Sequence, residues 1–179
     1  VLASFMKPVK CAAKAPTAGM RVIDELYRSS VQMWANNAFD APMHLAAKEV
    51  VARQKPRLLF VGYGETDEWA HSGMYDLLLR SAHQVDAFIA DLWTTMQAMP
   101  EYRGNTTFVI TTDHGRGSGP DAWRDHGQDV NGAEHIWMAI LGPDTPALGE
   151  RSGGEMVTQA QVAATIAALL GEDWNARNP

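Results

Sequence analysis

The sequence has 179 residues, of which 46% are hydrophobic and 20% charged, with 15 basic and 21 acidic side chains and a formal net charge of −6. This composition is typical of one globular domain that can bury a core without disulfides or a structural metal. The lone Cys11 excludes an internal disulfide framework and a cysteine-type zinc finger. The acidic balance argues against a surface that coats nucleic acid, and no apolar run approaches the roughly 18 residues of a membrane span.

The first forty residues carry weak periodicity, interrupted by Pro8, Pro16 and Gly19. We expect a short strand, a loop and a helix over about Met20 to Arg28. The numbering starts at Val1, and the opening residues have neither the length nor the flanks of a signal peptide. We therefore expect the numbering to begin inside a longer product, and this end predicts no compartment.

From residue 40 the pattern predicts a helix over 41–54, with Asp40 as its N-cap, followed by a strand over 58–61 that is buried on both faces. Apolar residues at helical spacing then predict a long helix over about 74–99. Two further apolar runs predict strands at 106–112 and 136–141, and a last helix begins at Thr158, with Gln161 in the capping-box position, and ends at Gly171. This order predicts an α/β fold, a single domain over 1–179 with a mainly parallel sheet between helices. The strands at 58–61 and 107–111 are expected as parallel neighbours, joined by the long helix.

Acidic and imidazole side chains follow the predicted strands. Asp67 and His71 come after the first strand, Asp113 and His114 directly follow the second, and Asp125 and His126 lie in the connection to the third. In an open α/β sheet the ligand site lies beyond the carboxyl ends of the strands, so these groups are expected to meet. Aspartate and neutral histidine suit zinc, with manganese or iron as alternatives. A pair of such ions can hold both the attacking and the leaving oxygen of a phosphoryl transfer.

Each of these residues also has a simpler interpretation. Asp67 and His71 could belong to a solvated turn, whereas two ionisable residues after a buried strand, as at Asp113 and His114, are costly unless something pairs with them. Arg116 is close enough to reach an anion held at a metal, but it equally fits an ordinary surface arginine. His44 is expected to be a partly exposed helix residue without a functional role.

Four segments, taken in order, resemble the alkaline phosphatase superfamily in its type I phosphodiesterase/nucleotide pyrophosphatase and sulfatase-like branch. The resemblance covers roughly residues 40–171. The segments that carry it are Gly64 to His71 (GETDEWAH), Thr111 to Gly117 (TTDHGRG), Trp123 to Gly127 (WRDHG) and Ile136 to Pro146 (IWMAILGPDTP).

The resemblance implies an alkaline-phosphatase-like fold and two divalent metals, most often zinc. Carried over by position, it makes Asp67, His71 and His126 the ligands of the first metal and Asp113 and His114 ligands of the second. His135 is the alternative third ligand of the first metal. The family also uses an upstream aspartate and a serine or threonine nucleophile, and no hydroxyl in residues 1–40 has the strand-to-helix context of that nucleophile. The chain then corresponds to the C-terminal portion of a metallohydrolase domain whose N-terminal part is missing.

By this resemblance the parent enzyme is a two-metal hydrolase of small-molecule phosphate or sulfate esters. The present chain would be inactive alone, and an uncovered sheet edge would favour self-association or cover by the missing segment. Two alternatives stay open: a phosphoglycerate-mutase-like phosphotransferase, and a non-catalytic α/β module that binds metal or another subunit.

Overall fold

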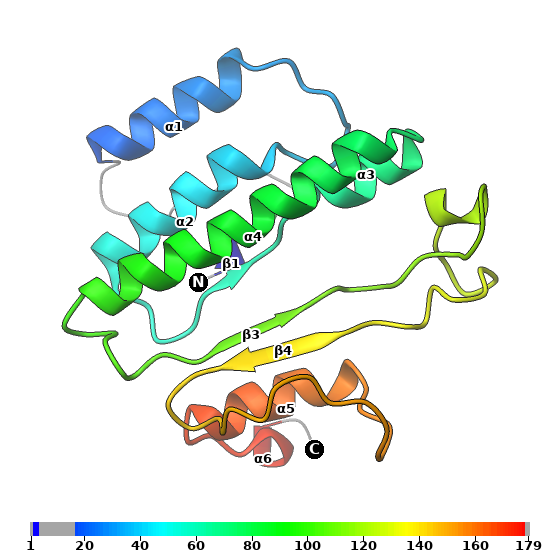
Figure 1. Cartoon of the computed structure of the whole chain (residues 1–179). Coiled ribbons are helices and arrows are strands. Elements are labelled where there is room, and N and C mark those ends of the chain that lie inside the picture. The colour runs from blue at the N-terminus through cyan, green and yellow to red at the C-terminus, as the bar shows by residue number, and fades with distance from the viewer. Residues whose placement is uncertain (1, 4–16, 178–179) are drawn as a thin grey trace.

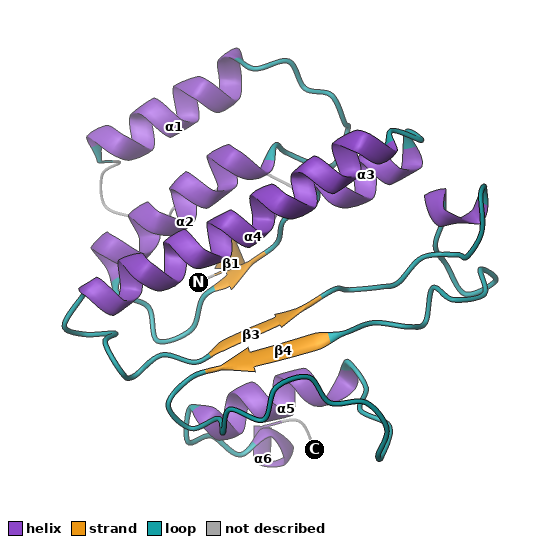
Figure 2. Cartoon of the chain, viewed as in Figure 1, coloured by secondary structure: helices purple, strands orange, loops and turns teal. Residues whose placement is uncertain are grey.

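The computed structural model describes residues 2–3 and 17–177, and helices make up most of its secondary structure (Figures 1 and 2). The elements in chain order are β1 (Leu2–Ala3), α1 (Ala18–Ser29), α2 (Asp40–Gln54), β2 (Phe60–Val61), α3 (Glu65–His71), α4 (Tyr75–Ala98), β3 (Phe108–Thr111), the short 3-10 helix η1 (Ala122–Arg124), β4 (Met138–Leu141), α5 (Ala160–Leu169) and α6 (Trp174–Arg177).

The helices that periodicity predicts lie close to their expected positions, whereas α3 and α6 were not predicted. α2 and α4 differ from the expected bounds by one residue at most at each end, and α1 is slightly longer than predicted. α1 begins after Thr17, whose hydroxyl accepts a hydrogen bond from the Met20 N–H at 3.0 Å and donates to Glu49 on α2 at 2.9 Å. α2 ends at Gln54, and the next residue, Lys55, adopts a left-handed conformation with φ 47° before Pro56. Local capping and proline positions therefore account for these bounds.

The α/β class is confirmed, but the prediction of a mainly parallel sheet is wrong. Within the described residues, β1 and β2 form one parallel pair, with Leu2 opposite Phe60, and β3 and β4 form a separate antiparallel pair, with Phe108 opposite Leu141. β2 and β3 are therefore not the neighbours that the sequence predicted. A parallel crossover needs a connection that spans the sheet, usually a helix. The connection from β3 to β4 holds only η1 and folds back as a loop, so β4 returns antiparallel.

The strands are also less buried than their apolar sequence predicted. Phe60 in β2 is 52% exposed, and Ile140 and Leu141 in β4 are 42% and 45% exposed. Each described sheet has two strands, so much of the apolar strand surface has no neighbouring strand to cover it. Even so, β2 and β3 point toward the same side of the molecule in Figure 1, which brings the segments that follow them toward each other.

The core lies between α2 and α4 and reaches the start of β3. Val51, Leu92, Met96 and Tyr102 form its buried centre, and Phe108 packs against it. The Tyr102 hydroxyl donates to the Pro56 carbonyl oxygen at 3.1 Å, so the polar end of this side chain has a partner. Across residues 2–3 and 17–177, none of the helices combines the length and apolar character needed to cross a bilayer.

The substitution Val51→Ala tests this core. Val51 is fully buried, so loss of its two methyl groups should lower the free energy of unfolding by about 2 kcal/mol. Val22→Ala on α1 removes the same groups at a site that is 65% exposed and should cost less than about 0.5 kcal/mol. Urea unfolding of the two variants checks the difference, and equal midpoints would show that the core lies elsewhere.

Candidate metal centre

The first part of the site comes from α3. Asp67 and His71 lie one turn apart on this helix, which places both side chains on one face. His71 Nε2 is 3.4 Å from Asp67 Oδ1. Both side chains are partly exposed, at 39% for His71 and 35% for Asp67, so solvent and small ligands can reach them.

The second part is the segment that follows β3. The His114 ring places Nε2 3.6 Å from Asp67 Oδ1, while its Nδ1 lies 2.9 Å from the Gly115 carbonyl oxygen. A carbonyl oxygen only accepts hydrogen bonds, so Nδ1 carries the ring proton and donates it there. The lone pair of His114 Nε2 is thereby left facing Asp67, which is the tautomer that ligates a metal.

The third part, the loop with His126, is held against this segment by backbone contacts. The Gly115 N–H donates to the Ala133 oxygen at 2.7 Å, and the Gly117 N–H donates to the Asp125 oxygen at 3.1 Å. A Cβ atom at position 115 would lie 2.2 Å from the His135 carbonyl oxygen, so this close approach requires glycine. The two loops are thus packed together in front of α3.

As a result, the rings of His114 and His126 stack with centroids 3.6 Å apart, and His126 Nε2 lies 3.5 Å from Asp67 Oδ1. Ligand atoms of Asp67, His114 and His126 lie within 4.8 Å of one another. Burial, together with the neighbouring His114, lowers the pKa of His126. His126 is therefore neutral over a wider pH range, which is the form that binds metals.

The arrangement divides the ligands differently from the expected two sets. Asp67, His71 and His126 do lie together, but His114, expected at the second metal, also faces Asp67 and is 3.7 Å from Asp113 Oδ1. The Asp113 side chain is 77% exposed at the rim of the cluster. Ligation by each of these residues stays a prediction.

His135 lies outside this cluster. Its side chain is 82% exposed, and its Nε2 is 3.8 Å from Glu134. His126, by contrast, contacts both Asp67 and His71, whose ring centroid is 4.9 Å from its own. The geometry therefore favours His126 over His135 as the partner of Asp67 and His71.

Arg116 also points at the cluster. Its Nη2 donates to the carboxylate of Asp67 and, at 3.1 Å, to the backbone oxygen of the same residue. Its Nη1 donates to the Arg124 backbone oxygen at 2.9 Å. The guanidinium joins α3, the segment after β3 and η1. Its positive charge also offsets the negative charge of the Asp67 carboxylate.

Sequence reasoning missed Asp40 and His44. His44 was expected to be partly exposed but is 3% exposed, because it faces the interior together with Ala47 and Val51 on α2. Asp40 is equally buried, and it does not cap its own helix: its Oδ1 accepts from the N–H groups of Gly64 and Glu65 at the start of α3. Asp40, His44, Ala47 and Val51 follow one another at spacings of three or four residues, so they share one face of α2. This spacing is the signal that would have revealed the burial of Asp40 and His44.

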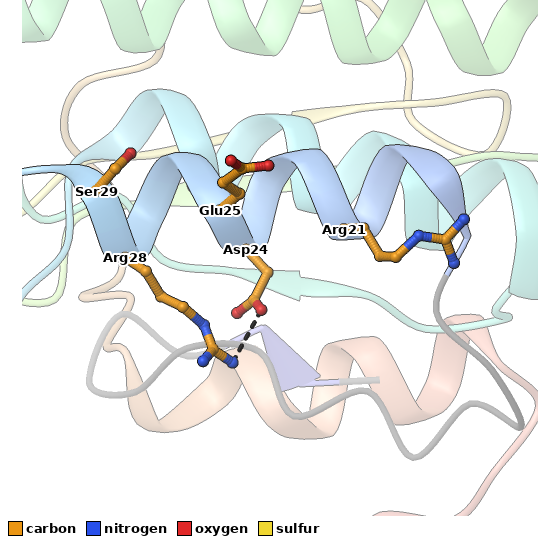
Figure 3. A pocket seen from close by; sticks show the side chains of 5 residues that line it. All are labelled: Arg21, Asp24, Glu25, Arg28 and Ser29. Carbon is orange, nitrogen blue, oxygen red and sulfur yellow. Dashed lines mark ion pairs between the residues drawn. The ribbon is translucent and has the colours of Figure 1, made fainter.

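A separate pocket lies along α1 and is unrelated to this cluster. Figure 3 shows its lining side chains along that helix, with the ion pair between Arg28 and Asp24 at 2.9 Å. It shares no residue with the metal cluster, and its lining comes from exposed positions of a single helix: Arg21, Asp24, Glu25, Arg28 and Ser29. The cluster is the candidate functional site, because three separate segments of the chain bring groups together there that could hold a metal ion.

Comparison with protein families gives a match over residues 4–151 to the family described as Type I phosphodiesterase / nucleotide pyrophosphatase. This range includes every residue of the cluster. Neither the comparison with curated proteins nor the comparison with solved structures gave a match.

The substitution Asp40→Asn should change how stability depends on pH. Burial raises the pKa of Asp40 from 3.8 to about 7, so the folded protein holds its proton where the unfolded chain has lost it. The free energy of unfolding of the wild type, relative to that of the variant, should therefore fall as the pH rises from about 4 to about 7. The total fall should be on the order of 4 kcal/mol at most. Urea unfolding at several pH values measures this difference, and parallel curves for the two proteins would contradict it.

Proposed function

Because the chain belongs to the type I phosphodiesterase/nucleotide pyrophosphatase family, we propose that it supplies metal-binding machinery for the hydrolysis of phosphate esters, with sulfate esters as a further substrate class. The observation that carries the proposal is the convergence of Asp67, His114 and His126 from three separate segments, with ligand atoms within 4.8 Å. Phosphoester chemistry is what the family supports, and the ligand assignment is our inference from the geometry.

The donor set fits a divalent metal. One carboxylate with two or three imidazoles is the combination that zinc, manganese and iron accept, and His114 already has its Nδ1 proton directed away from the cluster. When bound, such an ion would supply Lewis-acid stabilisation of the charge that develops on phosphoryl oxygens. We propose Asp67, His114 and His126 as the main donors, with His71 alongside them.

We extend the proposal to a second metal, for which this chain contributes Asp113 and His114. What supports it is the position of His114 between the carboxylates of Asp67 and Asp113, at 3.6 and 3.7 Å. The exposed Asp113 carboxylate is accessible to an ion from solvent. Zinc is our preferred identity for both ions because the donors are mixed nitrogen and oxygen groups.

Arg116 has a double role in this proposal. Its contacts with Asp67 and Arg124 position the carboxylate, so this arginine orients a ligand before any substrate arrives. A guanidinium carries five N–H groups, and the three described contacts leave donors for a phosphate or sulfate oxygen. We propose that Arg116 both holds Asp67 and contacts the substrate anion.

The hydroxyl groups of the N-terminal region have other partners. Thr17 caps α1 and contacts Glu49, while Ser29 and Ser30 both donate to the Leu26 carbonyl oxygen at the end of the same helix. Ser4 lies outside the described residues. We therefore propose that the described part of this chain supplies metal ligands and an anion contact but no nucleophile.

Metal binding tests the ligand assignment. Isothermal titration with zinc and with manganese should show binding to the metal-free protein, and Asp67→Ala or His126→Ala should weaken it by at least about tenfold because each removes a ligand. His135→Ala is the matched control and should bind as the wild type does. Weakening by His135→Ala comparable to that by His126→Ala would overturn the choice of ligand.

Activity assays test the missing nucleophile. The 179-residue chain supplied with zinc or manganese should hydrolyse p-nitrophenyl phosphate, bis-p-nitrophenyl phosphate and p-nitrophenyl sulfate no faster than its Asp113→Ala variant does. The reason is that a ligand set without a positioned nucleophile stabilises charge but lacks the covalent step. Turnover that Asp113→Ala abolishes would show that a hydroxyl of this chain, or metal-activated water, is sufficient.

A further inference from the structure

We infer that Asp40 and His44 on α2 are positioning residues of the metal centre, which together clamp the segment from Tyr63 to Glu65 and so fix where α3 presents Asp67 and His71. The inference rests on the proposed metal site for its functional meaning. The clamp itself is carried by hydrogen bonds that are independent of that site. Neither residue belongs to the ligand cluster.

Asp40 makes the first half of the clamp through reciprocal capping of two helices. Its Oδ1 accepts from the Gly64 N–H at 2.8 Å and from the Glu65 N–H at 3.3 Å, which are among the first N–H groups of α3. In return, the Asp40 N–H at the start of α2 donates to Glu65 Oε1 at 2.6 Å. The first N–H groups of a helix lack partners within it, so each helix here satisfies donors of the other.

His44 makes the second half one turn further along α2. Its Nδ1 lies 3.0 Å from the Tyr63 hydroxyl and its Nε2 lies 2.8 Å from Asp91 Oδ2 on α4. Lys48 donates to the same Asp91 oxygen at 2.7 Å, and the His44 ring stacks on Phe88 at 4.2 Å. Tyr63 is thereby tied to both long helices immediately before α3 begins.

These contacts matter for the site because α3 is short. It spans seven residues, too few to be stable in isolation, so contacts at its start and its packing on α4 must define its position. Asp67 lies two residues beyond Glu65. A shift at the start of α3 would therefore move the ligand directly.

The packing around the clamp leaves little room for adjustment. A Cβ atom at Gly64 would lie 2.2 Å from the Asn37 side-chain nitrogen, so this backbone is closely covered. Glu65 is fixed at its other oxygen by the Trp69 indole N–H at 3.2 Å. By contrast, Asp40 Oδ2 is buried without a hydrogen-bond partner, so one oxygen holds α3 while the other is uncompensated.

Four variants separate positioning from general stability. Asp40→Ala removes the cap and Tyr63→Phe removes only the hydroxyl that meets His44, whereas Asp40→Asn keeps the Oδ1 acceptor and serves as the conservative rescue. Val51→Ala is the matched control, because it weakens the core beneath α2 without touching the Tyr63 to Glu65 segment.

The first measurement is amide hydrogen exchange of residues 64–71 in the metal-free protein, normalised to the amides of α4. Asp40→Ala and Tyr63→Phe should each speed this exchange by about fivefold or more, while Asp40→Asn and Val51→Ala should stay near the wild-type ratio. Unchanged exchange in both Asp40→Ala and Tyr63→Phe would overturn the inference. If Asp40→Ala fails to fold, Tyr63→Phe decides the result alone.

The second measurement is zinc affinity of the same proteins, determined by competition with a chromophoric chelator. Asp40→Ala and Tyr63→Phe should each weaken zinc binding by about tenfold, because they remove contacts that orient a metal-ligating side chain. Val51→Ala should not weaken it. Equal losses in the core control would overturn a positioning role. If the wild-type protein binds no zinc, the proposed metal function fails, whereas the exchange ratio still decides whether the clamp exists.

Discussion

Three imidazoles and one guanidinium face a single carboxylate, that of Asp67, and the arrangement of the whole site depends on this carboxylate. His71, His114 and His126 place a ring nitrogen 3.4 to 3.6 Å from Asp67 Oδ1, and Arg116 donates to the same residue. These side chains come from α3, from the segment after β3 and from the loop that contains η1. The Asp67 side chain is 35% exposed, so solvent screens its charge. The arrangement therefore matters more for its geometry than for its contribution to stability.

The rest of the structure holds these three segments in their positions relative to one another. The core between α2 and α4 supports α3, which packs on α4 and is capped by Asp40. On the other side, Gly115 and Gly117 allow two loops to approach closely enough for His114 and His126 to stack. Glycines, a buried carboxylate and an apolar core thus contribute to one centre through different physical effects: freedom from a side chain, hydrogen bonding and burial.

Much of this organisation follows from local sequence patterns. Helix bounds are predictable because periodicity and capping act over a few residues. The candidate ligands after β2 and β3 are identifiable because polar groups at strand ends stand out against apolar runs. The strand pairing is not predictable in this way, because the direction of β4 depends on how residues 112–137 fold back. The partner of His114 is likewise set by the packing of two loops against α3.

The partners of the buried polar residues were the other point that local patterns did not resolve. Asp40 fits an N-cap of its own helix equally well in sequence, and only the tertiary structure shows that its carboxyl group serves α3 instead. His44 appears as a polar residue on an amphipathic helix until Tyr63 and Asp91 supply its two partners. Such assignments require knowledge of which elements pack together.

Anomalous diffraction at the zinc edge, from crystals of the protein grown with zinc, tests the central claim most directly. The account predicts an anomalous peak in contact with Asp67 and with Nε2 of His114 and His126, so that the ion replaces the present contacts among these groups. A peak at His135 and Glu134, or at other surface residues with none beside Asp67, would contradict the assignment of the metal centre.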